Sequence, residues 1–374
     1  MRENQKIYGL DLLRFIAVSI IIFGHLIEKF LLKYFDVPLY ISIQTHHAMM
    51  YGLMCELLFL ISGFLFYYST LKNQTIIDFM VKKWIRLAPV VVFSVLLWCF
   101  FPKLSVFQCY SSALLQCFFV AQNGIIGTSD MSHLWYIDVM LLSMVFYFYL
   151  LKNFDFKFVK LIMALIIFFS YTMIMPGEKY YPTDPYFHGI FFSFLLRGLA
   201  GIGVGFFLGY MHSSCSLSLK LTGLPYILYS CFEIFMFILL VCATLILECR
   251  LPSYIYIYIY SMVILLFAAD NGFFTKLINH KLNFSISKYI YSTYVIHMFV
   301  FTLLMEVIWE NPIIGINKYP LINLIFALVL PHIIGALVFH FIEQPSSKFL
   351  GIKYTQFKQH QKSCIMKEHD PSTP

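Results

Sequence analysis

The chain consists largely of apolar segments of about twenty residues, and this repetition restricts the folds that are open to it. Runs such as 224–247, 253–270 and 321–342 carry little charge. Each approaches or exceeds the length of about 20 apolar residues that a helix needs to cross a bilayer. A helix satisfies its own backbone hydrogen bonds inside lipid, whereas an open strand does not. The sequence therefore predicts an all-α, polytopic bundle of membrane-spanning helices.

About ten such spans use most of the 374 residues and leave no room for a large soluble domain. The predicted spans are 7–27, 48–69, 88–101, 132–151, 158–175, 187–211, 224–247, 253–270, 288–308 and 321–342. Residues 105–121 are expected to form a re-entrant or interfacial piece. SYIYIYIYSM at 253–262 alternates as a strand would. We predict a helix there, because lipid cannot satisfy an open strand edge.

The distribution of Lys and Arg residues between the two sides of the membrane predicts the orientation of the bundle. With a cytoplasmic N-terminus, 19 of the 26 Lys and Arg residues fall on the inner side, six fall on the outer side, and Arg197 lies within a span. This asymmetry follows the positive-inside rule and predicts that both termini are cytoplasmic. The formal net charge of +7 then requires no nucleic-acid partner.

The two ends of the chain are interpreted with the same rules. A basic start precedes the first apolar run, but Glu28 and Lys29 stand where a signal-peptide cleavage site would need small residues, so we expect a retained helix. Residues 1–345 are predicted as one transmembrane domain, and 346–374 as a basic cytoplasmic tail that is partly disordered. The nine cysteines form no C-x-x-C pair and are interpreted as buried hydrophobic residues. No metal-ligand constellation is evident.

The first predicted helix carries charged and titratable groups on one face. Arg14 and His25 are eleven residues apart, which is about three turns plus 20° and about 16 Å of helix. Asp11 and Glu28 fall within about 60° of the same stripe. Such groups in a span usually face a bundle interior or a water-filled cavity. The alternative is that Arg14 reaches to the cytoplasmic interface and His25 only bonds a neighbouring helix.

Six short motifs occur along the chain in a characteristic order. They are YGLDLLRFIAVSIIIFGH, CELLFLISGFLFYYS, KKWIRLAP, SHLWYIDVMLLSMVFY, YIYSTYVIH and FIEQP. Together they resemble the type-3 acyltransferase family of polytopic membrane enzymes over about residues 7–345. Each motif alone is weak, but six in order, with Arg14 and His25 in the first helix, make a specific pattern.

The resemblance implies an O-acyltransferase of the bacterial inner membrane that moves an acetyl group from acetyl-CoA to a hydroxyl of an envelope glycan or a lipid-linked sugar. Acetyl-CoA is then a co-substrate, and no permanently bound cofactor or metal is expected. Arg14 and His25 match the two positions most associated with activity, and Lys83 stands where the family often has Arg. The other matching positions are Glu56, Arg86, His133, Trp135, Tyr294, His297 and Glu343.

Chemical roles follow from the residue types. His25 suits a general base near neutral pH. Arg14 can bind a phosphate bidentately at the cytoplasmic mouth. The cations expected to assist it are Lys82, Lys83 and Arg86. Glu56 either orients His25 or forms a buried ion pair with Arg197. The residues that either bind substrate or pack in the core are His133, Trp135, Tyr294 and His297.

Two other features leave alternatives open. Ser62 before Gly63 could be a nucleophile, but a small residue in a span more often lets helices approach, as Gly201, Gly205 and Gly209 are expected to do. The competing function is a transporter of a lipid-linked sugar or organic acid, although the two related halves typical of many transporters are not evident. A third possibility is a structural membrane partner, for which His25 would be dispensable.

Overall fold

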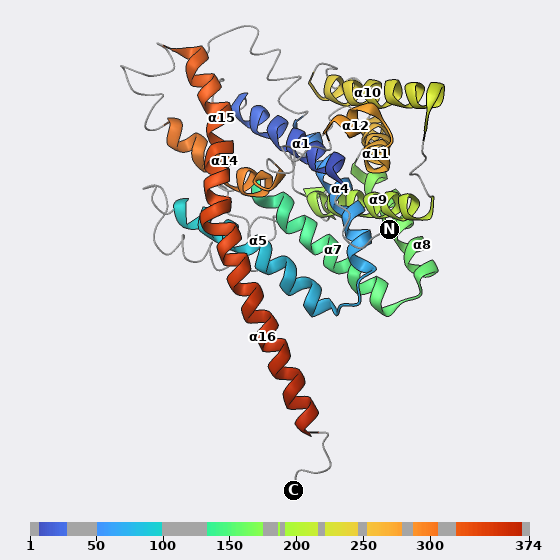
Figure 1. The fold of residues 1–374 in the computed structure, drawn as a ribbon, viewed down its shortest axis with the longest axis vertical. Helices are drawn as coiled ribbons and strands as arrows, with labels where there is room; N and C mark the ends of the chain where they lie inside the picture. Colours follow the sequence, from blue (N-terminus) through green and yellow to red (C-terminus); the bar gives the residue numbers. More distant parts are fainter. Residues whose placement is uncertain are drawn as a thin grey trace.

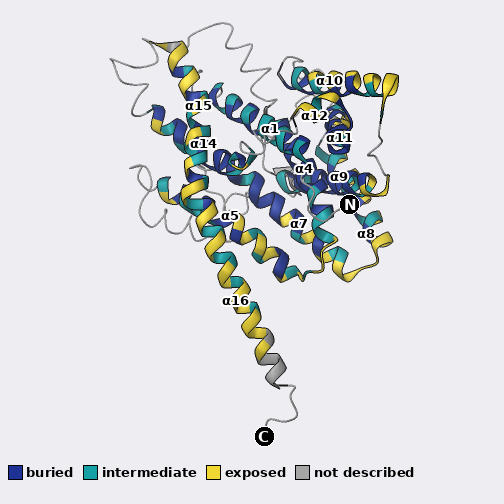
Figure 2. Cartoon of the chain, in the orientation of Figure 1, coloured by how far each residue is buried: buried dark blue, intermediate teal, exposed yellow. Residues whose placement is uncertain are grey.

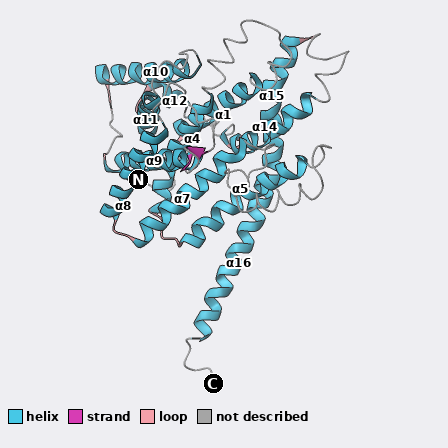
Figure 3. Cartoon of the chain, turned by 180° about the vertical axis from the view of Figure 1, so that it is seen from behind, coloured by secondary structure: helices cyan, strands magenta, loops and turns pink. Residues whose placement is uncertain are grey.

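The computed structural model describes residues 7–27, 51–98, 133–174, 186–187, 191–215, 221–245, 253–278, 287–305 and 319–368. This part of the chain is helical apart from the short antiparallel strands β1 (Tyr186–Phe187) and β2 (Phe191–Phe192). Figure 3 shows how small the strand pair is beside the helices. The prediction of an α-helical bundle is confirmed, and the segment 105–121 lies outside the described residues.

Every predicted span overlaps a helix. These helices are α1 (Tyr8–Leu26), α4 (Met54–Thr70), α5 (Ile76–Trp98), α7 (Trp135–Asn153), α8 (Phe156–Ile174), α9 (Ser193–Ser214), α10 (Gly223–Leu245), α11 (Ser253–Ala269), α14 (Ile290–Leu304) and α15 (Pro320–Val338). Shorter or additional elements are η2 (Tyr51–Leu53), α12 (Phe273–Ile278), the π-helix η5 (Phe339–Glu343) and α16 (Gln344–Glu368). The alternating segment at 253–262 is helical, as predicted.

Six of the described helices are long and apolar enough to cross a membrane. They comprise α1, α7, α8, α9, α10 and the continuous helix that begins with α15, while α4, α11 and α14 are shorter apolar helices. Helix α5 begins at Ile76, twelve residues before its predicted span. These apolar helices identify the chain as an integral membrane protein. The number of ten spans stays a prediction.

Helices α4 and α9 make the most extensive helix–helix contact of the described bundle (Figure 1). Gly205 lies directly against the carbonyl of Leu60 and the Cα of Gly63, so neither position has room for a larger side chain. Small residues in membrane helices allow such close backbone approach and the van der Waals contact that follows from it. The predicted packing role of the glycines in α9 is confirmed.

Large apolar side chains cover the outside of the bundle. Phe168 on α8, Tyr258 on α11 and Phe341 in η5 are each more than 70% exposed. Figure 2 shows exposed residues concentrated on outward-facing turns of peripheral helices such as α8 and α10. A soluble monomer rarely exposes apolar surface on this scale, whereas lipid chains solvate it without cost.

The C-terminal segment differs from the predicted partly disordered tail, because α16 continues as a helix to Glu368 and projects from the bundle (Figure 1). Tyr354 and Lys358 on α16 both contact the carboxylate of Asp78 at the start of α5. Lys358 and the hydroxyl of Tyr354 hold the pKa of Asp78 well below its usual range. Asp78 precedes the apolar part of α5, so this contact holds α16 against the polar start of α5.

Candidate active site

Three histidines from separate parts of the sequence meet inside the bundle. His25 lies in the last turn of α1, His297 lies in the middle of α14, and His133 lies just before α7. The rings of His25 and His297 are stacked with centroids 5.3 Å apart, and His133 meets His297 edge-on at 5.1 Å. His133 and His297 are buried, whereas His25 is only partly buried. We refer to these three residues as the imidazole cluster.

Backbone carbonyls fix two of these rings. Nδ1 of His297 lies 2.6 Å from the carbonyl oxygen of Tyr294, and Nε2 of His133 lies 3.1 Å from that of Val295. A carbonyl can only accept a hydrogen bond, so each of these nitrogens carries a proton. In the neutral ring the other nitrogen then has the lone pair. The hydroxyl of Tyr294 also donates to the backbone of His133, which holds α14 against the start of α7.

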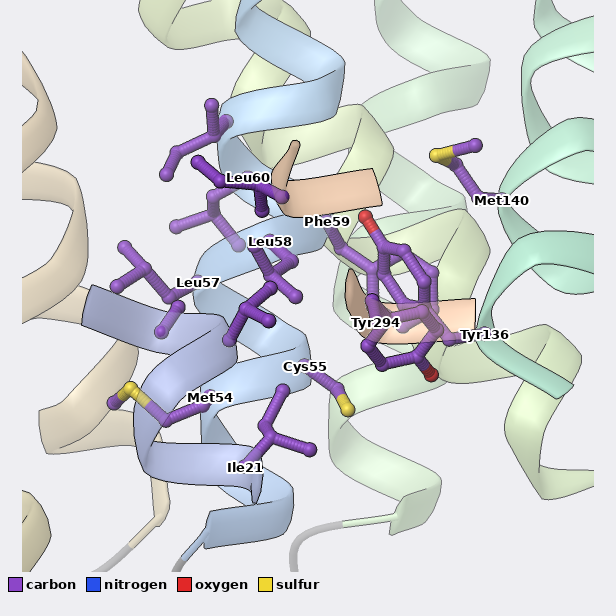
Figure 4. Packing of buried hydrophobic residues seen from close by; sticks show 14 of the residues in the cluster. Ile21, Met54, Cys55, Leu57, Leu58, Phe59, Leu60, Tyr136, Met140 and Tyr294 are labelled. Carbon is purple, nitrogen blue, oxygen red and sulfur yellow. The ribbon is translucent and has the colours of Figure 1, made fainter. Parts of the chain in front are cut away.

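The hydroxyl groups of Ser62, Tyr136 and Tyr294 lie beside the imidazole cluster, and we refer to them as the hydroxyl layer. Ser62 Oγ on α4 and the hydroxyl of Tyr136 on α7 are 3.1 Å apart and buried. The Tyr136 ring lies 5.8 Å from the Tyr294 ring, which in turn lies 5.8 Å from His297. Figure 4 shows the two tyrosines next to each other and beside Phe59 on α4.

A cationic cluster of Arg14, Lys83 and Arg86 lies close enough for its members to repel one another electrostatically. Arg14 also interacts with Tyr136, so the hydroxyl layer connects this cluster to the imidazoles. Asp11 accepts a hydrogen bond of 3.4 Å from Arg14. Burial, together with the charges of Arg86 and Arg14, lowers the pKa of Lys83 to about 7. Lys83 precedes the predicted span at 88–101.

Lys82 does not join the cationic cluster. Its ammonium group is exposed and donates to the side chain of Gln74 at 3.1 Å. Lys82 and Lys83 are adjacent on a helix, so they point in directions about 100° apart. The structure therefore groups three of the four cations predicted to bind the donor.

Glu56 forms an ion pair with Arg197, with 2.6 Å between Oε1 and Nε, and both side chains are buried. Among the described residues the structure brings Glu56 to Arg197 and not to His25, and the orienting role of Glu56 stays a prediction. The guanidinium of Arg197 also lies over the ring of Trp135 at 5.1 Å, and Trp135 stacks on Phe194 at 4.5 Å. Glu56 and Trp135 thus belong to a packed layer that joins α4, α7 and α9.

Removing one partner of such a buried ion pair leaves an uncompensated charge and costs about 3–5 kcal/mol. Substitution of Glu56 or Arg197 alone is therefore expected to destabilise the bundle. Among the described residues, no group of His, Cys, Asp and Glu side chains is arranged to hold a metal ion.

Two acidic residues near the site had no role assigned from the sequence. Glu343 lies in η5, accepts a hydrogen bond of 2.6 Å from Ser292 on α14 and interacts electrostatically with Arg86. Asp138 on α7 is fully buried and interacts with Tyr291. Both occur in motifs that support the family resemblance, FIEQP and SHLWYIDVM. Glu343 is buried at the end of the π-helix η5, and the sequence carries no signature of this local geometry.

An apolar helical bundle with buried imidazoles and a neighbouring cationic cluster defines an integral membrane protein with a polar reaction centre or a polar transport path. The model of the acyltransferase domain family matches residues 7–341, nearly the whole bundle, and the chain belongs to this family. It is a membrane protein of the acyltransferase kind, as the ordered motifs predict. No curated protein and no solved structure was found to match the chain.

Proposed function

We propose that the protein transfers an acetyl group from cytoplasmic acetyl-CoA to a sugar hydroxyl of an envelope glycan, such as an O-antigen or an exopolysaccharide. Family membership supports acyl transfer. The observation that carries the finer proposal is that Tyr136 lies near members of both clusters: it interacts with Arg14 of the cationic cluster, and its ring neighbours Tyr294, which lies beside His297. In this proposal the cationic cluster binds the phosphates of the donor, and the imidazole cluster acts at its thioester.

The cationic cluster suits the phosphates of coenzyme A. Arg14 can form two parallel hydrogen bonds to a phosphate, and Lys83 and Arg86 add positive charge close by. Arg14 and His25 are eleven residues apart on the continuous helix α1, which corresponds to about 16 Å. The pantetheine arm of coenzyme A is comparable in length, so a donor held at Arg14 presents its thioester near the imidazoles.

The imidazole cluster suits the proton transfer. The sugar oxygen attacks the thioester carbonyl carbon, the new C–O bond forms, and the C–S bond breaks. His25 accepts the hydroxyl proton and passes it to the departing thiolate, so the products are the acetyl ester and coenzyme A. His297, which is fixed by the Tyr294 carbonyl, stacks on His25 and restrains the orientation of its ring. General base catalysis of this kind contributes about 10²- to 10⁴-fold.

The test is the product of a strain that expresses the protein. Envelope polysaccharides should gain base-labile O-acetyl esters, measured by mass spectrometry with and without mild alkali. In a strain that expresses His25→Ala, the O-acetyl ester content should be lower by about 10²-fold or more, while the amount of the variant in the membrane stays near normal. His360→Ala, which changes an exposed histidine on α16, is the matched control and should be fully active.

Other outcomes separate the alternatives. Esters on a soluble cytoplasmic metabolite, with unchanged envelope glycans, would contradict the glycan acceptor but keep the transferase. Purified protein that neither binds nor hydrolyses acetyl-CoA would favour the transporter of a lipid-linked sugar or organic acid instead.

A further inference from the structure

The hydroxyl pair of Ser62 and Tyr136 has one hydrogen-bond donor more than it uses. Each hydroxyl carries one hydrogen, and the 3.1 Å bond between them uses one of the two. Within the described part of the chain, neither side chain makes a second hydrogen bond. Ser62 is 9% exposed and Tyr136 is 7% exposed, so bulk water does not readily supply an acceptor. A buried donor without an acceptor is costly, and it marks a place where a ligand oxygen fits.

Packing holds the pair close to both clusters of the site. The Tyr136 ring packs on Phe59 at 4.5 Å and on Tyr294 at 5.8 Å, which fixes the position of its hydroxyl. Arg14 interacts with Tyr136 from the side of the cationic cluster, and Tyr294 connects it to His297. A donor molecule that extends from Arg14 to the imidazoles would therefore pass this hydroxyl pair.

We infer that Ser62 and Tyr136 together donate one hydrogen bond to the carbonyl oxygen of the acyl thioester. This inference rests on the proposed transferase function and adds the group that stabilises the developing negative charge. As the acceptor hydroxyl attacks, electron density moves from the carbonyl double bond onto this oxygen. It returns when the C–S bond breaks. A fixed donor in a site shielded from water stabilises that charge and contributes about 10²- to 10³-fold in kcat.

The same geometry argues against Ser62 as a nucleophile. A serine nucleophile needs a base within hydrogen-bond distance. In the described structure the partner of Ser62 is the phenol of Tyr136, and no imidazole bonds to it. The pair is therefore suited to donate a hydrogen bond and not to form an acyl-enzyme.

The test uses the purified full-length protein with acetyl-CoA and a glycan acceptor that the wild type acetylates. Ser62→Ala and Tyr136→Phe each leave one hydroxyl with its own hydrogen, so each should lower kcat less than about tenfold. The double variant has no donor and should lower kcat by about 10²- to 10³-fold. The KM for acetyl-CoA should change little in all three, because the bond strengthens only in the transition state.

Tyr147→Phe is the matched control. Tyr147 lies on the same helix, is also buried and donates to the Leu199 carbonyl at 2.9 Å, away from the site. It should keep wild-type kcat. A loss of kcat in Tyr147→Phe comparable to that of the double variant would point to general destabilisation and overturn the inference.

Three results would overturn the inference while the proposed function stands. They are a double variant with wild-type kcat, a loss confined to the KM for acetyl-CoA, and an inactive but folded Ser62→Ala, which would indicate a nucleophile. The single variants decide this last point even if the double variant does not fold. A wild type that binds no acetyl-CoA and acetylates no acceptor would instead overturn the proposed function and this inference with it.

Discussion

Lys83 differs from the other members of the cationic cluster because its charge changes near neutral pH. Its pKa is lowered to about 7 by burial and by Arg86 and Arg14. If the ammonium form binds a donor phosphate, affinity for acetyl-CoA is highest below that pKa and falls as the pH rises through it. Loss of one charged hydrogen bond costs about 1.5–3 kcal/mol, or roughly 10- to 100-fold in Kd.

We therefore expect the Kd of the wild type for acetyl-CoA, measured by calorimetry in detergent, to increase between pH 6 and pH 8.5. Lys83→Arg keeps its charge over this range and should flatten the curve. Because the ionisation of the donor is the same for both proteins, their difference isolates Lys83. Parallel curves for the two proteins would remove Lys83 from the donor site.

At the residue scale, the sequence identifies candidates but not their contacts. Arg14 and His25 share one helix, so helix geometry alone puts them on one face. The contact of His25 with His297 joins residues far apart in the chain, and only tertiary packing creates it. The two interpretations of Glu56 could not be separated for the same reason, since Arg197 is 141 residues away.

The contact between α4 and α9 depends on glycine at the point of closest approach. A Cβ at position 205 would collide with the Leu60 carbonyl and with Gly63. Gly205→Ala should therefore force the helices apart and lower stability by about 1–3 kcal/mol, as overpacked substitutions do. Gly351→Ala on α16 meets open space and should leave stability unchanged or slightly higher. Thermal unfolding in detergent compares the two, and equal effects would contradict a packing role for Gly205.

At the element scale, hydropathy predicts the existence of helices better than their ends. Every predicted span overlaps a helix because lipid leaves the backbone few other structures. The early start of α5 and the extension of α16 were not predicted, because polar residues there carry no hydropathy signal. Both are stabilised by the contacts of Asp78 with Tyr354 and Lys358, which are about 280 residues further along the chain.

At the scale of the whole molecule, the helix ends predicted to lie in the cytoplasm meet in space. His212 at the end of α9 bonds Tyr68 near the end of α4, at 2.7 Å, and the Ala268 carbonyl at the end of α11, at 3.0 Å. Gly9 at the start of α1 lies against Phe267. These ends share one side of the bundle, as alternating spans require. Which compartment that side faces is predicted by the charge asymmetry alone.

Cysteine labelling in intact cells tests that orientation. On a background in which all nine cysteines are replaced, Tyr319→Cys before α15 should react with a membrane-impermeant thiol reagent, because that end is predicted to lie outside. Asn73→Cys, between α4 and α5, should react only after the membrane is permeabilised. Both positions are exposed in the structure, so accessibility to the reagent depends on the side of the membrane and not on burial.

The result bears directly on the mechanism. Asn73 is near the start of the helix that carries Lys83 and Arg86, so its side is the side from which the cationic cluster is reached. Acetyl-CoA is a cytoplasmic metabolite, and a cluster that opens to the cytoplasm can bind it. Labelling of Asn73→Cys in intact cells, with protection of Tyr319→Cys, would place the cluster on the opposite face. Acetyl-CoA could not then be the donor, although the family and the helical bundle would be unaffected.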